Sequence, residues 1–245
     1  MTDRTLELSV NGLTVAARIS GGAERVLRPL VDRLFAEKAR RRAPLVVFLA
    51  GPPGAGKSTL SLILERLAAA RVPGVLEALP MDGYHHTAAY IGAHTVLRDG
   101  EIVPMARVKG SPESFDVEAL RAAIRGLRGG AVRWNGYDRR KHDVVEGEIP
   151  ITGEILVVEG NWLMLREPGF SELRGLCDLS ISLTAEEALL RERLIRRKRQ
   201  GGASPEAALC HYETCDRPNI LRYRDHSAPG DVRLRVLSDG EYEMI

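Results

Sequence analysis

The chain has 245 residues, of which 44% are apolar and 28% charged, and 35 basic side chains against 33 acidic ones leave a formal charge of +2. This length and composition predict one large α/β core that needs no disulfides. The near-neutral balance excludes a global field that would draw the chain to nucleic acid or to a membrane surface, so we expect neither as a partner.

Three further features narrow the class of protein. No apolar run approaches the eighteen or so residues of a membrane span, and the first residues, MTDRTLE, lack the apolar segment of a signal peptide. We therefore expect a cytoplasmic protein. Its cysteines, Cys177, Cys210 and Cys215, are an odd number at no metal-ligand spacing, which predicts reduced structural thiols. The oligomeric state is left open, a homodimer included.

The beginning of the chain predicts a hairpin followed by a helix. Residues 5–10 and 13–19 alternate apolar and polar side chains around Asn11-Gly12, the pattern of a β-hairpin. Residues 23–41 then place apolar side chains on one helical face and end in several basic ones. Because cations favour the negative end of the helix dipole, we interpret this basic end as a solvated terminus.

An apolar strand at residues 45–50 runs directly into the pattern G-x-x-x-x-G-K-S and then into an apolar-patterned helix. This order predicts a phosphate-binding P-loop rather than a glycine-rich turn without a ligand. The glycines let consecutive backbone N–H groups point at an anion, while Lys57 adds a cation near the β- and γ-phosphates and Ser58 offers a hydroxyl to Mg²⁺. The candidate ATP-binding residues of this segment are Gly51, Pro52, Pro53, Gly54, Ala55, Gly56, Lys57, Ser58 and Thr59.

Apolar strand candidates recur after the P-loop and alternate with helical patterns. They lie at residues 75–81, 154–158, 178–183 and 231–237. The alternation predicts the three-layer α/β fold of P-loop NTPases, a doubly wound parallel sheet between helices, with ligands at the carboxyl ends of the strands. We place this domain at residues 44–245 and treat residues 1–43 as an extension packed on it.

Two of these strand candidates end in an acidic residue followed by glycine, Asp82-Gly83 and Glu159-Gly160. Such pairs also make ordinary turns. The carboxyl ends of parallel strands meet at one edge of the sheet, where the P-loop also lies. We therefore favour catalytic or metal-binding roles for both acids over purely structural ones.

The P-loop alone does not separate kinases from switch GTPases and motor ATPases. The chain contains neither the D-x-x-G segment nor the N-K-x-D guanine reader of a switch GTPase. The second acidic strand ends Val-Val-Glu-Gly, where a motor ATPase usually has Asp-Glu. These absences favour a kinase.

Four segments beyond the P-loop resemble those of the phosphoribulokinase and uridine kinase family, and most closely its bacterial subgroup of nucleoside/nucleotide kinase-like, pantothenate kinase-like or fructose-transport-system kinases. The resemblance covers roughly residues 44 to 237. The segments are MDGYHH at 81–86, KGSPESFD at 109–116, YDRRKHD at 137–143 and VEGNW at 158–162. Together and in this order they are specific to the family, but they do not specify a substrate.

The resemblance implies roles for several residues. Asp82 corresponds to the general base that accepts the proton of the acceptor hydroxyl, and a carboxylate suits that role in phosphoryl transfer. Glu159 corresponds to the acid that helps hold the Mg²⁺ shell, with Ser58 as the direct metal ligand. Lys57 is a further candidate catalytic residue. The candidate substrate-binding residues are Asp82, His85, His86, Lys109, Tyr137, Arg139 and His142.

The segment at residues 109–116 resembles pantothenate kinases more than uridine kinases. Asp116 is interpreted first as the N-cap of a helix with an apolar face, while Lys109 is as readily structural as a substrate contact. The three histidines carry the same ambiguity, because lone histidines are usually structural.

A basic segment near the carboxyl end predicts a helical lid. Thr184 opens a predicted capping box, and the helix continues through six basic residues in nine to a Gly-Gly break. A second helix begins at Ser204-Pro205. Lid arginines would close over the phosphates, and Arg193 and Arg197 share one helical face as the candidates. A solvated face and a nucleic-acid patch are the alternatives.

The predicted lid spans about residues 190–215, and Asn219 just beyond it is a further candidate for contact with ATP. Our interpretation is an ATP- and Mg²⁺-dependent kinase that transfers the γ-phosphate to a hydroxyl of a small molecule, pantothenate-like, sugar or nucleoside. The alternative is a non-catalytic nucleotide-binding regulator, for which a base beside the γ-phosphate would have no use.

Overall fold

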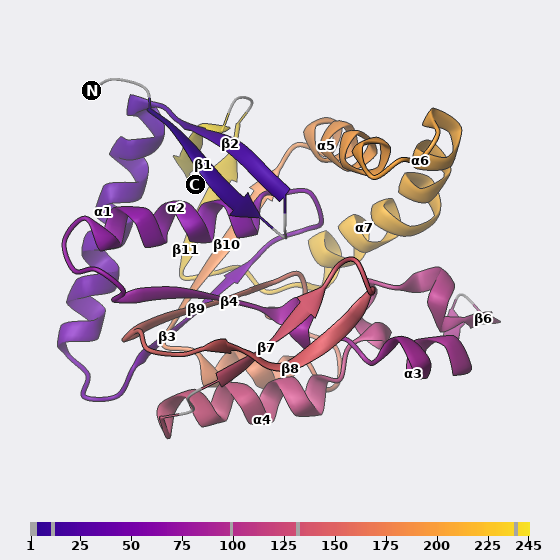
Figure 1. The fold of residues 1–245 in the computed structure, drawn as a ribbon, viewed down its shortest axis with the longest axis horizontal. Coiled ribbons are helices and arrows are strands. Elements are labelled where there is room, and N and C mark those ends of the chain that lie inside the picture. Colours follow the sequence, from indigo (N-terminus) through magenta and orange to yellow (C-terminus); the bar gives the residue numbers. More distant parts are fainter. Residues whose placement is uncertain (1–3, 11–12, 99, 131–132, 238–239) are drawn as a thin grey trace.

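The computed structural model describes residues 4–10, 13–98, 100–130, 133–237 and 240–245. Its centre is a six-stranded sheet in the order β12-β11-β10-β3-β9-β4 (Figure 1). The strands are β3 (Leu45–Ala50), β4 (Leu76–Pro80), β9 (Ile155–Gly160), β10 (Leu179–Ala185), β11 (Val232–Val236) and β12 (Tyr242–Met244). Five of them are parallel, which confirms the predicted α/β sheet, and β12 adds an unpredicted antiparallel edge.

Helices cover both faces of this sheet. Helices α1 (Gly21–Ala39) and α2 (Lys57–Ala69) lie on one face, and α4 (Val117–Arg128) lies on the other (Figure 1). Successive side chains of a strand point to opposite faces. Accordingly, Leu45, Val47 and Leu49 of β3 join the apolar core that includes α1 and α2, while the alternate residues of β3 join the core that includes α4.

Among the described residues, three two-stranded hairpins lie outside the central sheet. Strands β1 (Arg4–Val10) and β2 (Leu13–Ile19) pair antiparallel and precede α1, whose N-cap Ser20 accepts a hydrogen bond from Ala23 N. The predicted turn at residues 11–12 lies outside the described residues. The other hairpins, neither of them predicted, are β5 (Thr95–Arg98) with β6 (Glu101–Pro104) and β7 (Arg133–Asp138) with β8 (Asp143–Pro150).

Four further α-helices are found among the described residues. They are α3 (Ala88–Ala93), α5 (Glu187–Gln200), α6 (Pro205–His211) and α7 (Arg217–His226), with a π-helical turn at Tyr212–Asp216 and 3₁₀ turns at η1 (Met81–Tyr84), η2 (Met105–Val108), η3 (Pro112–Ser114) and η4 (Ser171–Leu176). No helix within the described part of the chain is long and apolar enough to span a bilayer.

Two of three predicted helix caps are confirmed. Asp116 Oδ1 accepts from Ala119 N at the start of α4, and Ser204 Oγ accepts from Ala207 N at the start of α6. The capping box at Thr184 is wrong, because β10 continues through Ala185 and Thr184 Oγ1 donates to Leu234 O of β11 instead.

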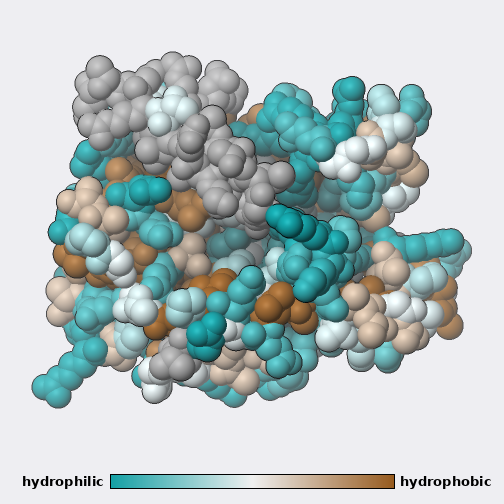
Figure 2. Space-filling view, viewed as in Figure 1, coloured by the Kyte–Doolittle hydropathy of each residue, from teal (hydrophilic) through white to brown (hydrophobic). Residues whose placement is uncertain are grey.

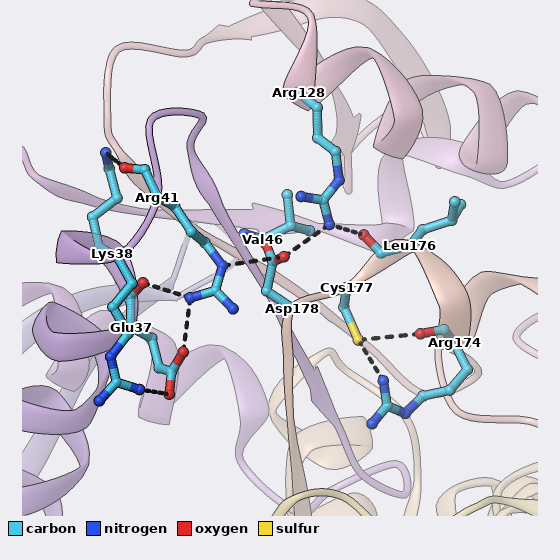
Figure 3. A network of polar contacts seen from close by, with 10 residues as sticks. Glu37, Lys38, Arg41, Val46, Arg128, Arg174, Leu176, Cys177 and Asp178 are labelled. Carbon is cyan, nitrogen blue, oxygen red and sulfur yellow. Dashed lines mark hydrogen bonds and ion pairs between the residues drawn. The ribbon is translucent and has the colours of Figure 1, made fainter.

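A polar network connects residues at the amino-terminal ends of the central strands, on the side of the sheet opposite the P-loop (Figure 3). The carboxylate of Asp178, just before β10, accepts from Val46 N at 2.9 Å and lies 3.1 Å from Arg128 Nη2 and 3.4 Å from Arg41 Nε. The basic end of α1 is therefore tied to the sheet rather than only solvated. Cys177 beside it is a buried free thiol, and burial raises its pKa to about 11.

Candidate active site

The P-loop connects β3 to α2 in a conformation that requires glycine. Gly54 and Gly56 have φ of +79° and +90°, in the left-handed region that disfavours side chains. A Cβ at Gly51 would lie 2.8 Å from Leu183 O, so β3 and β10 leave no room for one. The loop thus delivers the N-terminus of α2, where backbone N–H groups favour an anion.

Lys57 lies buried at the base of this loop, with 8% of its surface exposed. Its ammonium donates to Gly51 O at 2.9 Å, to Pro52 O at 3.1 Å and to Asn161 Oδ1 at 2.5 Å. Burial lowers the pKa of Lys57 to about 8, and the nearby carboxylates of Glu159 and Asp82 oppose this effect. An anionic phosphate here would supply the counter-charge that three neutral oxygens do not.

Ser58 and Glu159 form an oxygen-rich pair beside Lys57. Ser58 Oγ donates to Glu159 Oε1 at 2.7 Å, and burial raises the pKa of Glu159, with Lys57 acting in the opposite direction. A hydroxyl and a carboxylate are the ligand types that Mg²⁺ prefers. Among the described residues, no group of three or more His, Cys, Asp or Glu side chains could hold a metal alone. The pair therefore fits Mg²⁺ that takes its other ligands from phosphates and water.

Asp82 follows β4 directly, in the η1 turn, and lies 40% exposed at the same edge. Strands β4 and β9 run parallel with Pro80 opposite Glu159, so the two acids leave the sheet together. Asp82 Oδ2 accepts from Arg139 Nη2 at 2.9 Å. Gly83 permits this arrangement, since a Cβ there would lie 2.0 Å from Asn135 O of β7.

The β7–β8 hairpin forms one wall of the site with its turn. It carries Tyr137, Arg139 and His142, and Lys109 Nζ donates to His142 O at 2.9 Å while lying 5.2 Å from the centre of the Tyr137 ring. In Figure 2, hydrophilic side chains gather over the tip of this hairpin and over α5. This wall offers cations, an aromatic ring and hydrogen-bond donors to a bound molecule.

His85 and Phe115 extend that wall toward Asp82. Their rings lie 3.8 Å apart between centroids, and His85 Nδ1 is 3.0 Å from the backbone oxygen of Asp82. Burial lowers the pKa of His85, which favours the neutral ring at pH 7. A neutral ring that donates from Nδ1 keeps Nε2 as an acceptor.

The opposite wall comes from α5 and the helices that follow it. Arg197, His211, Asp216 and Asn219 all line the cavity, and His211 Nε2 lies 3.9 Å from Asp216 Oδ2 across the π-helical turn. Burial raises the pKa of Asp216. Asn219 is 5% exposed, and its Oδ1 has no hydrogen-bond partner within the described part of the protein. A buried acceptor of this kind calls for a donor from a ligand.

These walls enclose a cavity of about 280 Å³. The predicted site residues among its lining are Pro53, Gly54, Lys57, Ser58, Asp82, His85, Lys109, Tyr137, Arg139, His142, Glu159, Arg197 and Asn219. Their roles remain predictions, but the fold brings them together from seven separate segments of the chain.

Two groups of predicted residues do not line the cavity. The loop and first-turn positions are Gly51, Pro52, Ala55, Gly56 and Thr59, which build the phosphate cradle behind it. His86 stacks on Tyr90 of α3, 4.2 Å between centroids, and Arg193 Nη1 lies 3.5 Å from Gly54 O on the loop. Arg197, and not Arg193, reaches the cavity.

Sequence reasoning missed several lining residues: Gly110, Phe115, Gly160, Asn161, His211 and Asp216. Asn161 could have been found, because it is the next polar residue after the strand that ends in Glu159. His211 and Asp216 are five residues apart, a spacing that an α-helix does not bring together, so helical periodicity gave no reason to pair them.

Residues 46–228 match the model of the Phosphoribulokinase / Uridine kinase family. The chain belongs to this family. Its members are P-loop kinases, which accounts for a cradle, a lysine and two strand-end acids around one cavity.

The chain is also similar to several individual proteins. The protein YggC of Escherichia coli K12, itself uncharacterized, is 38% identical over 241 residues, covering 97% of this chain and 98% of that protein. A pantothenate kinase of Rhodopseudomonas palustris BisB5 is 30% identical over 177 residues, 68% of this chain and 53% of that enzyme. The crystal structure of a protein assigned as a fructose transport system kinase from Silicibacter sp. TM1040 matches with a TM-score of 0.75 and 28% identity, covering 84% of this chain and 98% of that one.

Proposed function

We propose that the protein transfers the γ-phosphate of ATP, with Mg²⁺, to a hydroxyl of a small molecule. The observation that carries this proposal is the position of Asp82, whose carboxylate lines the same cavity as Lys57, Ser58 and Glu159. A carboxylate beside the phosphate cradle suits removal of a proton from an attacking hydroxyl.

The residues in and beside the P-loop would position the triphosphate of ATP. The α2 N-terminus and Lys57 hold the phosphates, and Ser58 with Glu159 would hold Mg²⁺, which supplies charge neutralisation when bound. Arg197, on the opposite wall, lies where a cation can offset the charge that develops on the transferred group. We assign this role to Arg197 rather than to Arg193.

Asp82 is arranged to accept the proton. Arg139 occupies Oδ2, and within the described residues no hydrogen bond reaches Oδ1, which leaves that oxygen for the acceptor hydroxyl. The bond from the γ-phosphorus to the acceptor oxygen forms as the bond to the β–γ bridging oxygen breaks, and the hydroxyl proton passes to Asp82.

The acceptor is a pantothenate-like, sugar or nucleoside molecule. Asn219 Oδ1 is a buried acceptor, and a fully ionised phosphate has no proton to give it. We therefore infer that Asn219 Oδ1 accepts a hydrogen bond from a ligand. The donor is a second hydroxyl or an amide N–H of the acceptor, or a group of the nucleoside of ATP. Tyr137, Lys109 and His142 form the wall against which the acceptor packs.

The test is a screen of hydroxyl acceptors by ADP release, followed by Asp82→Asn on the acceptor found. The amide keeps the size of the side chain but takes no proton, so turnover should fall by about 10²- to 10⁴-fold while ATP affinity stays within a few-fold. The matched control is Asp116→Asn, which still caps α4. If Asp82→Asn lowers only ATP affinity, Asp82 belongs to the metal shell. If it lowers neither, Asp82 is not the base, and if no acceptor gives ADP release with the wild type, the protein is a nucleotide-binding regulator.

A further inference from the structure

Asn161 has an orientation that its neighbours determine. Lys57 Nζ can only donate, so the atom of the Asn161 amide that faces it must be the oxygen, Oδ1. The amide nitrogen Nδ2, with two hydrogens, then points away from Lys57. Within the described residues no acceptor takes a hydrogen bond from Nδ2, and Asn161 lines the cavity.

The backbone on both sides of Asn161 is held in place. A Cβ at Gly160 would lie 2.5 Å from Met81 Cβ, so the end of β9 packs against the end of β4 without a gap. Trp162 is fully buried, and its Nε1 donates to Gly110 O at 3.0 Å. A side chain held in this way is preorganised for a ligand.

The sheet order places Asn161 between the two reacting ends of the site. Strand β9 lies between β3, which leads into the P-loop, and β4, which leads into Asp82. A phosphoryl group that leaves the cradle toward an acceptor held by Asp82 must therefore cross the end of β9. Asn161 is the first residue after that strand.

We propose that Asn161 is a γ-phosphate ligand that holds Lys57 through Oδ1 and donates from Nδ2 to a γ-phosphate oxygen. The inference rests on the proposed function in taking ATP as the nucleotide. Asn161 exchanges no proton and forms no covalent bond. Its contact is made to ATP and to the transferring group, and is absent with ADP.

The competing role is a tether that only positions Lys57. The two roles differ in their effect on nucleotide preference, because Lys57 serves the β-phosphate as well as the γ-phosphate. Loss of a tether should weaken ADP and ATP by similar factors. Loss of a γ-phosphate donor should weaken only the nucleotide that has a γ-phosphate.

The experiment measures dissociation constants for MgADP, for a non-hydrolysable MgATP analogue and for MgADP with aluminium fluoride, by calorimetry. For Asn161→Ala we expect the ATP analogue and the aluminium fluoride complex to weaken about 10- to 100-fold, the loss of a hydrogen bond to a charged group, with ADP changed less than about threefold. Retained ADP binding shows that the variant is folded.

Asn161→Asp is the second variant, because it keeps an oxygen for Lys57 but has no donor. It should lose the preference for the ATP analogue over ADP at least as fully as the Ala variant. The control is Asn135→Ala, because Asn135 Oδ1 accepts from Gly147 N in the β7–β8 hairpin outside the cavity. It should leave all three constants unchanged.

Equal weakening of ADP and the ATP analogue in Asn161→Ala, or an unchanged preference in Asn161→Asp, would overturn the inference and leave Asn161 as a tether. These outcomes do not depend on the acceptor. A wild-type protein that binds the ATP analogue but phosphorylates nothing would refute the proposed kinase activity alone. A wild-type protein that binds neither nucleotide would refute both.

Discussion

Replacement of Lys57 by Met is expected to stabilise the nucleotide-free protein although it removes nucleotide binding. Burial lowers the pKa of Lys57 from 10.5 to about 8. Each tenfold change in proton affinity is worth about 1.4 kcal/mol, so burial of this charge costs the folded state about 3 kcal/mol at neutral pH. Met has a similar volume and no charge. It leaves three oxygens without their donor, which reduces the expected gain to about 1 to 2 kcal/mol.

The difference in stability between the wild type and the Lys57→Met variant depends on pH. Between pH 8 and 10.5 the unfolded chain keeps the Lys57 proton and the folded protein loses it, so the stability of the wild type rises with pH relative to the variant. By about pH 10 the wild type should therefore be the more stable of the two proteins. At pH 7 a saturating nucleotide should reverse the order too, because only the wild type gains binding energy.

Urea unfolding of both proteins at pH 7, 8, 9 and 10 measures the difference in stability, and the titration of groups remote from Lys57 cancels. Lys141→Met is the control, since that side chain is 78% exposed and its replacement should change the stability little. A Lys57→Met variant that is less stable at pH 7, or a difference that stays constant up to pH 10, would show that burial of Lys57 carries no such cost.

Two further predictions concern the metal and the arginines of α5. Ser58→Ala removes a hydroxyl but leaves Glu159, so activity should fall and recover in part as Mg²⁺ is raised; an Mg²⁺ titration that recovers nothing would contradict the metal role. Arg197→Ala should lower turnover more than the acceptor KM, because Arg197 lines the cavity and would contact developing charge. Arg193→Ala, whose guanidinium lies against Gly54 O, should have the smaller effect on turnover. Steady-state kinetics of the two variants side by side test this, and the reverse ranking would assign the charge contact to Arg193.

The sequence predicted the parts of the fold whose signals are local. A continuous apolar run before the P-loop must be a buried strand, and the recurrence of such runs between helical patterns is typical of a parallel sheet. The β7–β8 hairpin was missed because its first strand, RWNGYD, has little alternation and contains Gly136 where the side chain of Glu148 packs. Thr184 met the pattern of a cap, but pairing of β10 with β11 kept it in the sheet.

In the candidate site, too, some residues could be predicted from local sequence signals and others could not. Residues at the ends of strands, such as Asp82 and Glu159, could be placed from the sequence because parallel strands bring their ends together. His211 and Asp216 could not, since a π-helical turn aligns residues five apart and no pattern in the sequence marks where such a turn occurs. Phe115 was not singled out as a site residue, because tertiary packing alone brings its ring against His85.

Within the described part of the chain the β7–β8 hairpin makes no strand pairing with the central sheet, yet it supplies Tyr137, Arg139 and His142 to the cavity. The phosphate cradle, in contrast, is built from the core strands themselves. Natural variation can therefore exchange one part of the site while the other stays constant. Mutations in the hairpin can accumulate at small cost to the core, and a lineage with this architecture can acquire new acceptors while it keeps the same nucleotide chemistry.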